Sequence, residues 1–238
     1  MEKTALLYEG KAKKVYSTND ENLLIVSYKD DATAFNGLKK GEIEGKGEVN
    51  NRVSNILMKY LEQNGVKTHF VKELSPRETL VKKVALVPLE VIVRNISAGS
   101  FSKRYGVSEG IEFKEPTTEF SYKNDELGDP LINDSHAIAL GVATKAEIDE
   151  IRHAALKINS LLKKYFLDVN ILLVDFKLEF GRLPDGEIVL ADEISPDTCR
   201  FWDSETREKL DKDRFRRDLG NVQGAYAEIM RRVVGVEA

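Results

Sequence analysis

Hydrophobic and charged positions alternate most regularly within residues 172–203, LLVDFKLEFGRLPDGEIVLADEISPDTCRFWD. An alternation with a period of two is typical of a half-buried β-strand. The charged positions of the first strand are Asp175, Lys177 and Glu179, and its apolar positions include Phe176, Leu178 and Phe180. The turn-forming sequence Pro184-Asp185-Gly186 and a second apolar run, 188–191, follow. We therefore expect a β-hairpin with one charged face and a far end that carries Asp192 and Glu193.

The pattern in the rest of the first half predicts mainly strands. They span residues 4–8, 11–16, 23–28, 68–74, 79–84 and 89–95. Apolar residues at helical spacing predict a helix over 48–64, after which Gly65 lies where a helix-ending glycine is expected. Residues 30–47 contain four glycines and little periodicity, so we expect a loop that serves as a mobile flap.

The second half is predicted to contain an irregular segment and two further helices. Residues 101–133 show little pattern, and we expect short strands and loops whose charged residues are only solvated. Thr144 and Glu147 have the spacing of a capping box, which predicts a helix from there to about residue 167. A last helix is predicted over 221–234, where apolar residues recur at helical spacing.

The composition is that of a globular protein. The chain has 238 residues, of which 42% are hydrophobic, and its net charge is −4. This charge argues against nucleic acid as a partner, because phosphate backbones bind basic surfaces. No apolar run approaches the ~20 residues of a membrane span, and no secretory leader is evident. The single cysteine, Cys199, excludes an internal disulfide. We therefore expect a cytoplasmic protein without a membrane partner.

The charged end of the predicted hairpin has the chemistry of a metal and phosphate site. Glu179 and Asp192 are expected to meet across the hairpin, and Mg²⁺ prefers carboxylate oxygens when phosphates complete its coordination. Lys177 lies between them and could contact a substrate anion, while Asp197 and Arg200 follow close to the same end. The alternative is an ordinary charged strand face that is only solvated.

Two other segments place cations next to glycine or small residues. Lys11 and Lys13 follow Gly10 and could lie over the phosphates of a nucleotide. On these residues alone, a hairpin with a basic outer face is the favoured interpretation. Arg94 ends a predicted strand, and the small-residue loop that reaches Ser100 makes a phosphate cradle plausible. The alternative for Arg94 is a pairing with a local carboxylate.

A basic cluster, KDRFRR, occupies residues 212–217. Such a run is usually a solvated face, but Arg214, Arg216 and Arg217 follow closely on the acidic hairpin, so we expect anion binding. The three histidines lack metal-ligand spacing, and no nucleophile elbow or Cys/His signature is present. The many charged residues suit phosphoryl transfer, in which catalysis comes mainly from positioning and charge neutralisation.

Seven blocks of the sequence, in order along the chain, resemble the SAICAR synthetase family, also called phosphoribosylaminoimidazole-succinocarboxamide synthase. The blocks are YEGKAKKVY at 8–16, VNNRVSNILM at 49–58, LVKK at 80–83, VRNISAGS at 93–100, LVDFKLEFG at 173–181, DEISPDTCRFWD at 192–203 and DKDRFRRDLG at 211–220. Because they extend over essentially the whole chain, the resemblance is highly specific.

The resemblance implies an α+β fold similar to the ATP-grasp and kinase-like group. We expect two lobes of mainly antiparallel sheet with packed helices, residues 1–84 and 85–238, and the nucleotide in the cleft between them. The implied activity joins 5-amino-1-(5-phosphoribosyl)imidazole-4-carboxylate to L-aspartate and yields SAICAR, ADP and phosphate in purine biosynthesis. A small-molecule kinase of related fold is the alternative. Bacterial relatives suggest a homodimer.

The resemblance also implies roles for individual residues. It assigns ATP contacts to Lys11, Ala12, Lys13 and Lys82, and Mg²⁺ coordination to Glu179 and Asp192. Contacts with the ribonucleotide or another anion are assigned to Arg94, Ser100, Arg200 and Arg216. Asp175, Lys177 and Asp197 are assigned catalytic positions beside the imidazole and its carboxylate. A flap is expected at residues 31–37. The residues that bind L-aspartate are not identified at this stage.

Overall fold

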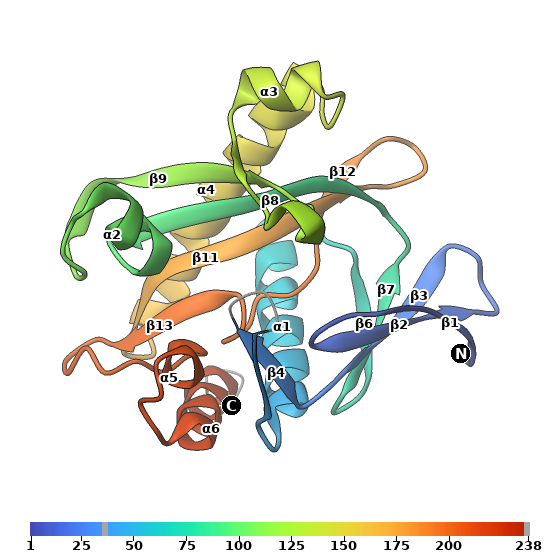
Figure 1. Cartoon of the computed structure of the whole chain (residues 1–238). Coiled ribbons are helices and arrows are strands. Elements are labelled where there is room, and N and C mark those ends of the chain that lie inside the picture. The colour runs from blue at the N-terminus through green and yellow to red at the C-terminus, as the bar shows by residue number, and fades with distance from the viewer. Residues whose placement is uncertain (35–37, 236–238) are drawn as a thin grey trace.

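The chain forms two large antiparallel sheets and one small one, with helices packed against them (Figure 1). The computed structural model describes residues 1–34 and 38–235. The expected α+β class is confirmed. In the described part of the chain, no helix is both long and apolar enough to cross a membrane.

The first sheet contains five strands from the first third of the chain. In spatial order they are β1 (Lys3–Glu9), β2 (Lys13–Thr18), β3 (Leu23–Tyr28), β7 (Glu78–Lys82) and β6 (Phe70–Ser75). β2 begins two residues later than predicted. The reason is a tight turn, in which the N–H of Gly10 donates to the carbonyl of Lys13 at 2.9 Å. Lys11 and Ala12 therefore form the tip of the turn between β1 and β2.

The second sheet is built around the long strand β11. Its other members are β8, β9, β10, β12 and β13, and the bounds are β8 (Ala85–Ile96), β9 (Glu112–Tyr122), β10 (Leu131–Ile132), β11 (Ile171–Arg182), β12 (Ile188–Ala191) and β13 (Cys199–Asp203). The predicted hairpin is confirmed, since Glu179 lies opposite Ala191 in the β11–β12 pair. On the other side of β11, Asp175 lies opposite Arg94. This register gathers charged residues of three strands at one place.

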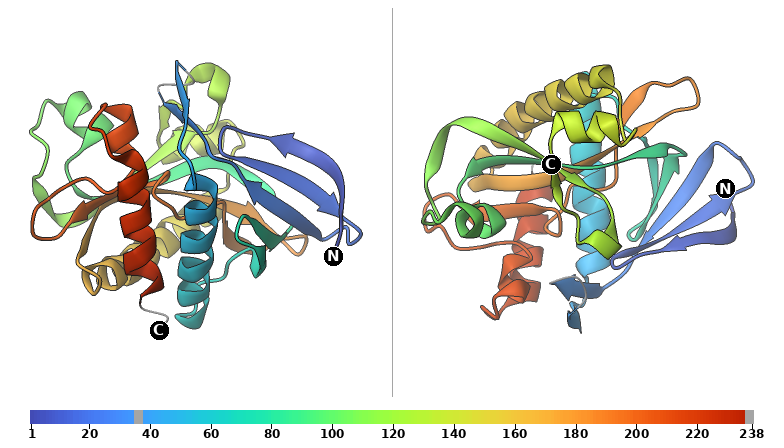
Figure 2. Two further views of the ribbon diagram at one scale, coloured as in Figure 1. Left: turned by 90° about the horizontal axis from the view of Figure 1, so that it is seen from below. Right: turned by 45° about the horizontal axis from the view of Figure 1, so that its top comes forward.

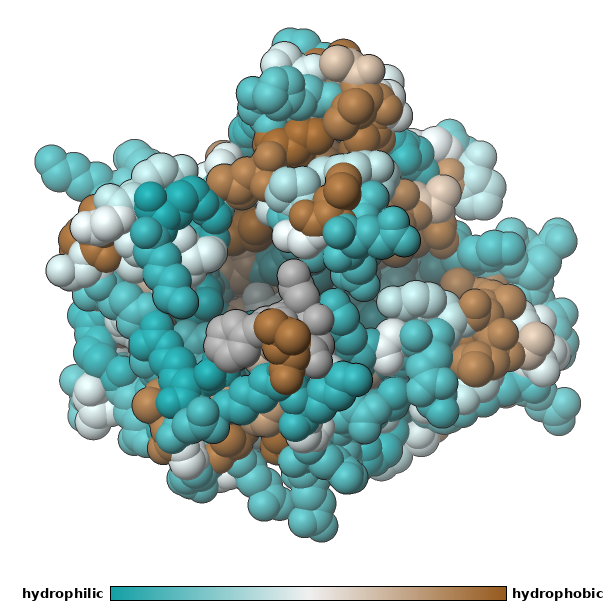
Figure 3. Space-filling view, viewed as in Figure 1, coloured by the Kyte–Doolittle hydropathy of each residue, from teal (hydrophilic) through white to brown (hydrophobic). Residues whose placement is uncertain are grey.

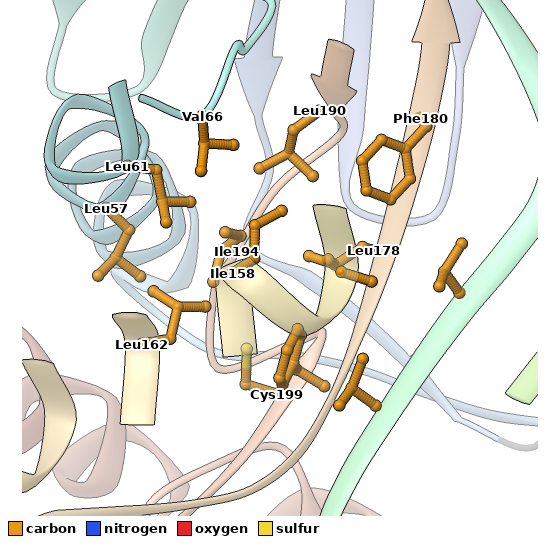
Figure 4. Packing of buried hydrophobic residues seen from close by; sticks show 14 of the residues in the cluster. Leu57, Leu61, Val66, Ile158, Leu162, Leu178, Phe180, Leu190, Ile194 and Cys199 are labelled. Carbon is orange, nitrogen blue, oxygen red and sulfur yellow. The ribbon is translucent and has the colours of Figure 1, made fainter. Parts of the chain in front are cut away.

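Two long helices and β11 share one buried apolar cluster (Figure 4). The helices are α1 (Lys46–Gln63) and α4 (Lys145–Leu167). Leu57 of α1, Leu162 of α4 and Leu178 of β11 are each at most 1% exposed. Full burial of one such side chain contributes about 1.5–3 kcal/mol. The cluster therefore fixes which face of β11 is apolar and leaves its charged face to the opposite side.

The predicted helix ends are also found. The side chain of Thr144 accepts from the N–H of Glu147 and the capping box is complete. Beyond α1, Gly65 has φ +71, a left-handed conformation that glycine adopts without steric cost. The predicted last helix is α6 (Val222–Val234), which packs beside α1 (Figure 2).

Residues 30–47 are more ordered than predicted. They contain a hairpin of β4 (Asp31–Ala34) and β5 (Lys39–Glu42). Asp30 holds its base, because the carboxylate accepts 2.7 and 2.9 Å hydrogen bonds from Arg77 and a 2.8 Å bond from the N–H of Gly47. The sequence of β5, Lys39-Lys40-Gly41-Glu42, contains no apolar side chain, so it gives no alternation from which a strand could be predicted. Part of the predicted flap, residues 35–37, lies outside the described residues.

The prediction of only short strands and loops over residues 101–133 was wrong. The segment includes most of helix α2 (Gly99–Tyr105), the eleven-residue strand β9 and a short helix η1 (Asp125–Leu127). The reason is that β9 pairs β8 on one side but buries few of its side chains, so most of them are polar and no period-two signal results. Two further short helices are α3 (Asp134–Ala139) and α5 (Asp213–Arg216).

The chain passes from the first sheet to the second between β7 and β8, at residues 83–84. Helix α1 belongs to the N-terminal segment, yet its buried residues share the main core cluster with α4 and β11. The two sheets are thus joined by a common helix. A division of the chain into lobes at residue 84 stays a prediction.

Candidate active site

A cleft of about 900 Å³ lies between the two large sheets. On this face of the molecule Figure 3 shows a hollow with hydrophilic residues along much of its rim. The cleft lining includes the thirteen residues to which the family resemblance gives a role, and these are Lys11, Ala12, Lys13, Lys82, Arg94, Ser100, Asp175, Lys177, Glu179, Asp192, Asp197, Arg200 and Arg216. The structure therefore brings them into one cleft.

Lys177 is the centre of a group of charges on the second sheet. Its Nζ lies 2.5 Å from Glu179, 3.3 Å from Asp192 and 3.3 Å from Glu90. Glu90 belongs to β8 and lies opposite Glu179 of β11. Lys13 of the first sheet contacts Asp192 as well. These lysines neutralise carboxylates that would otherwise repel one another.

The Glu179 carboxylate stays ionised although it is buried. Burial alone raises its pKa, but Lys177 and Lys123 outweigh burial and lower the pKa to about 2. Lys123 donates a 2.8 Å hydrogen bond to Glu179. This contact corrects the expectation that Lys123 is only solvated. The alternative of a merely solvated strand face is also wrong, since Glu179 is 3% exposed.

A pH dependence of stability follows from this lowered pKa. The folded pKa of Glu179 lies below the ordinary value of 4.5, so its stabilising charge pairing is complete above pH 4.5 and is lost as the pH falls toward about 2. We expect the difference in unfolding free energy between the wild type and Glu179→Gln to be constant above pH 4.5 and to shrink below it. Urea unfolding at a series of pH values measures this, and a difference that does not change with pH would refute the pairing.

The acidic side chains beside Lys177 could bind a cation whose remaining ligands are phosphate oxygens. Glu179 and Asp192 both face the cleft. The neighbouring Glu193 is 4% exposed, and its Oε2 has no hydrogen-bond partner among the described residues. Among the described residues, no group of three or more histidine, cysteine, aspartate or glutamate side chains could hold a metal ion on its own. This donor set fits Mg²⁺, which typically takes one or two carboxylates together with phosphate oxygens.

Two arginines, the buried Arg94 and the half-buried Arg200, share one carboxylate at the other end of β11. Asp175 accepts a 2.7 Å hydrogen bond from Arg94 and bonds of 2.8 and 3.0 Å from Arg200. Arg94 also donates to Glu119 at 3.0 and 3.1 Å and to the hydroxyl of Ser100 at 3.1 Å. Both interpretations of Arg94 thus find support, because it pairs with carboxylates and also lines the cleft.

Gly99 lets Arg200 reach this position. Its φ is +55, and a Cβ at residue 99 would lie 2.2 Å from Nη2 of Arg200. We expect Gly99→Ala to displace the guanidinium and to raise the KM for a phosphate-bearing substrate. Gly106→Ala is the matched control, since Gly106 has φ +65 and nothing lies within 4 Å of an added Cβ. Both variants should lose about 1–2 kcal/mol of stability from the left-handed backbone. Equal KM values in the two variants would contradict the role of Gly99.

The basic cluster at residues 212–217 is only partly directed into the cleft. Arg216 lines the cleft and donates a 2.7 Å hydrogen bond to Asp213. Arg214 instead bonds Glu208 at 2.7 Å, and Arg217 bonds Glu109. The expectation that all three arginines serve one anion site is therefore wrong for Arg214 and Arg217, which lie outside the cleft lining.

Asp197 lies in a buried network of its own. It accepts hydrogen bonds from Lys46 at 2.8 Å and from the hydroxyl of Tyr226 at 2.6 Å, and Lys212 lies 3.4 Å away. Burial raises the pKa of Asp197, but Lys212 and Lys46 outweigh burial and hold that pKa well below its usual range. Lys46 is fully buried, and sequence reasoning missed it because it lies in a segment expected to be a flap.

The first sheet supplies an apolar wall and several lysines. Its wall consists of Val15, Leu24, Val26 and Val81, which cluster together and line the cleft. Lys82, at the end of β7, donates to the carbonyl of Thr68 at 3.4 Å. Lys11, on the turn before β2, lies 3.4 Å from Asp125. An apolar wall next to cations complements a nucleotide, because the base is apolar on both faces and the phosphates are anionic.

Known proteins resemble this chain in both sequence and fold. The family described as SAICAR synthetase matches residues 6–233. A phosphoribosylaminoimidazole-succinocarboxamide synthase of Caldanaerobacter subterraneus is 66% identical over 98% of this chain and 99% of its own. The crystal structure of such a synthase from Ehrlichia chaffeensis has a TM-score of 0.95 at 47% identity, covering 96% of this chain and 98% of its own. A SAICAR synthetase in complex with ADP has a TM-score of 0.93 at 53% identity, covering 96% and 97%.

Proposed function

The chain belongs to the SAICAR synthetase family, and we propose that the cleft between its two large sheets is where the ligation takes place. The activity is the ATP-dependent joining of 5-amino-1-(5-phosphoribosyl)imidazole-4-carboxylate to L-aspartate in purine biosynthesis, with SAICAR, ADP and phosphate as products. The observation that carries the location is that one cleft holds the apolar wall, the Lys177 charge group and the pair Arg94 and Arg200.

The nucleotide is assigned to the side formed by the first sheet. Its base would lie against the wall that contains Val26 and Val81, with Lys82 nearby. The turn of Lys11 and Ala12 together with Lys13 would contact the phosphates. Lys13 supports this assignment, because it extends from β2 to Asp192 of the second sheet. Phosphates between these groups would link the two sheets.

Glu179 and Asp192 are assigned as the ligands of Mg²⁺. When bound, the ion supplies charge neutralisation for the phosphoryl group in transfer. Lys177 then keeps contact with the same carboxylates and offers its ammonium to the substrate carboxylate. Its pKa is raised above its ordinary value, because Glu179 and Glu90 outweigh the effect of burial. Lys177 thus acts as a fixed positive charge and not as a base.

The ribonucleotide is assigned to the second sheet. Arg94, Ser100 and Arg200 would bind its phosphate, since their donors converge within one buried group. Asp175 and Asp197, with Lys177, are assigned positions beside the imidazole and its carboxylate. Asp175 would act there mainly by holding the two arginines, whose hydrogen bonds it accepts.

Two bond-forming steps complete the proposed reaction. A carboxylate is a poor electrophile, so an oxygen of the substrate carboxylate first bonds the γ-phosphorus of ATP as the bond to the ADP oxygen breaks. The amine of L-aspartate then attacks the acyl carbon and loses a proton, and phosphate leaves with that carboxylate oxygen. The arrangement helps because three anionic substrates repel one another unless cations separate them.

Two finer assignments complete the proposal. The protein acts in the cytoplasm, and it acts as a homodimer.

The rival activity is that of a kinase of related fold. A kinase would need no amine substrate, and its product would keep the phosphate.

The activity is tested by omitting each substrate in turn. Purified protein is incubated with MgATP, the carboxyaminoimidazole ribonucleotide and L-aspartate, and ADP and the amide are quantified. Equal amounts of both products, formed only when all three substrates are present and abolished by EDTA, are expected. ADP with a phosphorylated ribonucleotide and no amide would identify a kinase instead.

A further inference from the structure

Apart from its hydrogen bonds to Asp175, Arg200 is held on two further sides. On one side its Nε donates a 2.9 Å hydrogen bond to Asp213. On the other side its guanidinium packs against Gly99, where an added Cβ would lie 2.2 Å from Nη2. The position of Arg200 in the cleft therefore depends on the groups that fix Asp213 and the backbone of Gly99.

Glu109 fixes the backbone of Gly99. Its Oε1 accepts a 2.9 Å hydrogen bond from the N–H of Gly99. Arg217 donates to both oxygens of the same carboxylate, at 2.9 Å in the case of Oε2, and Lys209 lies 3.5 Å away. Burial raises the pKa of Glu109, but the hydrogen bonds from Arg217 and from the N–H of Gly99 outweigh burial and lower the pKa to about 2. The carboxylate is therefore ionised, and its pairing is complete, at neutral pH.

Arg217 connects the two supports of Arg200. Its Nη atoms hold Glu109, while its Nε lies 3.8 Å from Asp213, the carboxylate that accepts from Arg200. A guanidinium can bridge two carboxylates in this way because its donors point in fixed directions. The contacts through Gly99, Glu109, Arg217 and Asp213 form a closed chain that begins and ends at Arg200.

The segment that carries Glu109 is fastened to the loop of Gly99 at Ser97. The N–H of Ser97 donates to the carbonyl of Ile111 at 2.9 Å, and its hydroxyl donates to the carbonyl of Ser108 at 2.7 Å. Ser97 itself is completely buried. These two contacts lie on either side of Glu109 in the sequence, so its carboxylate projects from a segment whose ends are fixed.

We propose that Glu109 and Arg217 are positioning residues for the phosphate of the ribonucleotide. They hold the two supports of Arg200 in place and thereby direct its guanidinium toward the phosphate. The inference rests on the proposed function, which assigns Arg200 to that phosphate. It also gives a role to Arg217, which belongs to the basic cluster but lies outside the cleft lining. The alternative is an ion pair that contributes only to stability, and it predicts no effect on one substrate alone.

The test measures kcat and the KM of each substrate for Glu109→Gln and Arg217→Gln. The two side chains are 29% and 37% exposed, so both variants should fold, because partly exposed pairs contribute little to stability. Each variant is expected to raise the KM for the ribonucleotide about tenfold, since a displacement of about 1 Å can cost about 10²-fold and the fixed ends of the segment limit the displacement. The kcat and the KM for ATP should stay within about twofold, as expected when only ribonucleotide binding is weakened.

Glu112→Gln is the matched control. It removes a 2.8 Å surface pair with Arg207 in the same region and should leave all kinetic values unchanged. Arg217→Lys keeps the charge but loses the fork. It should raise the KM for the ribonucleotide less than Arg217→Gln does, and it serves if Arg217→Gln unfolds.

The ribonucleoside that lacks the phosphate gives a readout that a merely structural role would not move. The ratio of kcat/KM for the ribonucleotide to kcat/KM for the ribonucleoside measures the contribution of the phosphate. In Glu109→Gln this ratio should fall by the factor by which the KM rises. The inference is overturned if the variants leave the KM for the ribonucleotide unchanged, or if they lower both kcat/KM values equally. A wild type that forms no amide would instead refute the proposed function, and the inference with it.

Discussion

Asp192→Asn is expected to lower kcat by about 10²–10³-fold while the fold stays intact. The carboxylate is assigned to Mg²⁺, and groups that stabilise charge in the transition state contribute effects of this size. The substitution should leave the backbone conformation unchanged. Asp192 has φ +61, and asparagine tolerates this left-handed region as aspartate does. Steady-state kinetics at saturating substrates measures the loss, with thermal unfolding as the check on the fold.

The matched control for Asp192→Asn is Asp149→Asn on the exposed side of α4. Asp149 bonds Lys145 at 2.7 Å, so it also loses an ion pair, but it lies outside the cleft lining. Its kcat should equal that of the wild type. A near-normal rate for Asp192→Asn at saturating Mg²⁺ would remove Asp192 from the metal site.

Asp175→Asn is expected to destabilise the protein by about 3–5 kcal/mol, because it breaks a buried charge network by removing one partner. Asp175 is 4% exposed and accepts hydrogen bonds from two arginines. After the substitution, one carboxylate fewer balances Arg94 and Arg200, and an amide N–H₂ faces their donors. The KM for the ribonucleotide should rise as well, because the arginines lose the group that positions them.

Chemical denaturation of the wild type and Asp175→Asn measures the loss of stability. Glu112→Gln is a suitable comparison, since Glu112 pairs Arg207 at 2.8 Å on the surface and exposed pairs contribute only about 0–1 kcal/mol. If Asp175→Asn cost no more than Glu112→Gln, the shared-carboxylate account of the arginine pair would be wrong.

The hairpin of β11 and β12 could be predicted because the signals that specify it lie within the hairpin's own sequence. Alternation sets which side chains of β11 share a face, and the Pro184-Asp185-Gly186 turn sets the register that places Glu179 opposite Ala191. The capping box at Thr144 and the glycine after α1 are local signals too. Strand β9 lacked such a signal, since few of its side chains are buried.

The contacts between distant segments could not be predicted in the same way. Lys46 bonds Asp197 across 151 positions of sequence, and Lys123 bonds Glu179 across 56. Nothing in the neighbourhood of Lys46 or Lys123 in the sequence distinguishes them from solvated lysines. Their partners depend on how α1 and β9 pack, which is decided by the core. Likewise, the run at residues 212–217 does not reveal that Arg216 alone of its three arginines lines the cleft.

An ¹⁸O label in the substrate carboxylate shows whether that carboxylate receives the phosphoryl group of ATP. The ribonucleotide is labelled with ¹⁸O in both carboxylate oxygens and converted with MgATP and L-aspartate, and the phosphate is analysed by mass spectrometry. If the carboxylate is phosphorylated before the amine attacks, each phosphate carries one ¹⁸O from the ribonucleotide, and the other label stays in the amide. Phosphate without ¹⁸O would show that ATP is cleaved by another nucleophile, and would contradict the reaction proposed for this cleft.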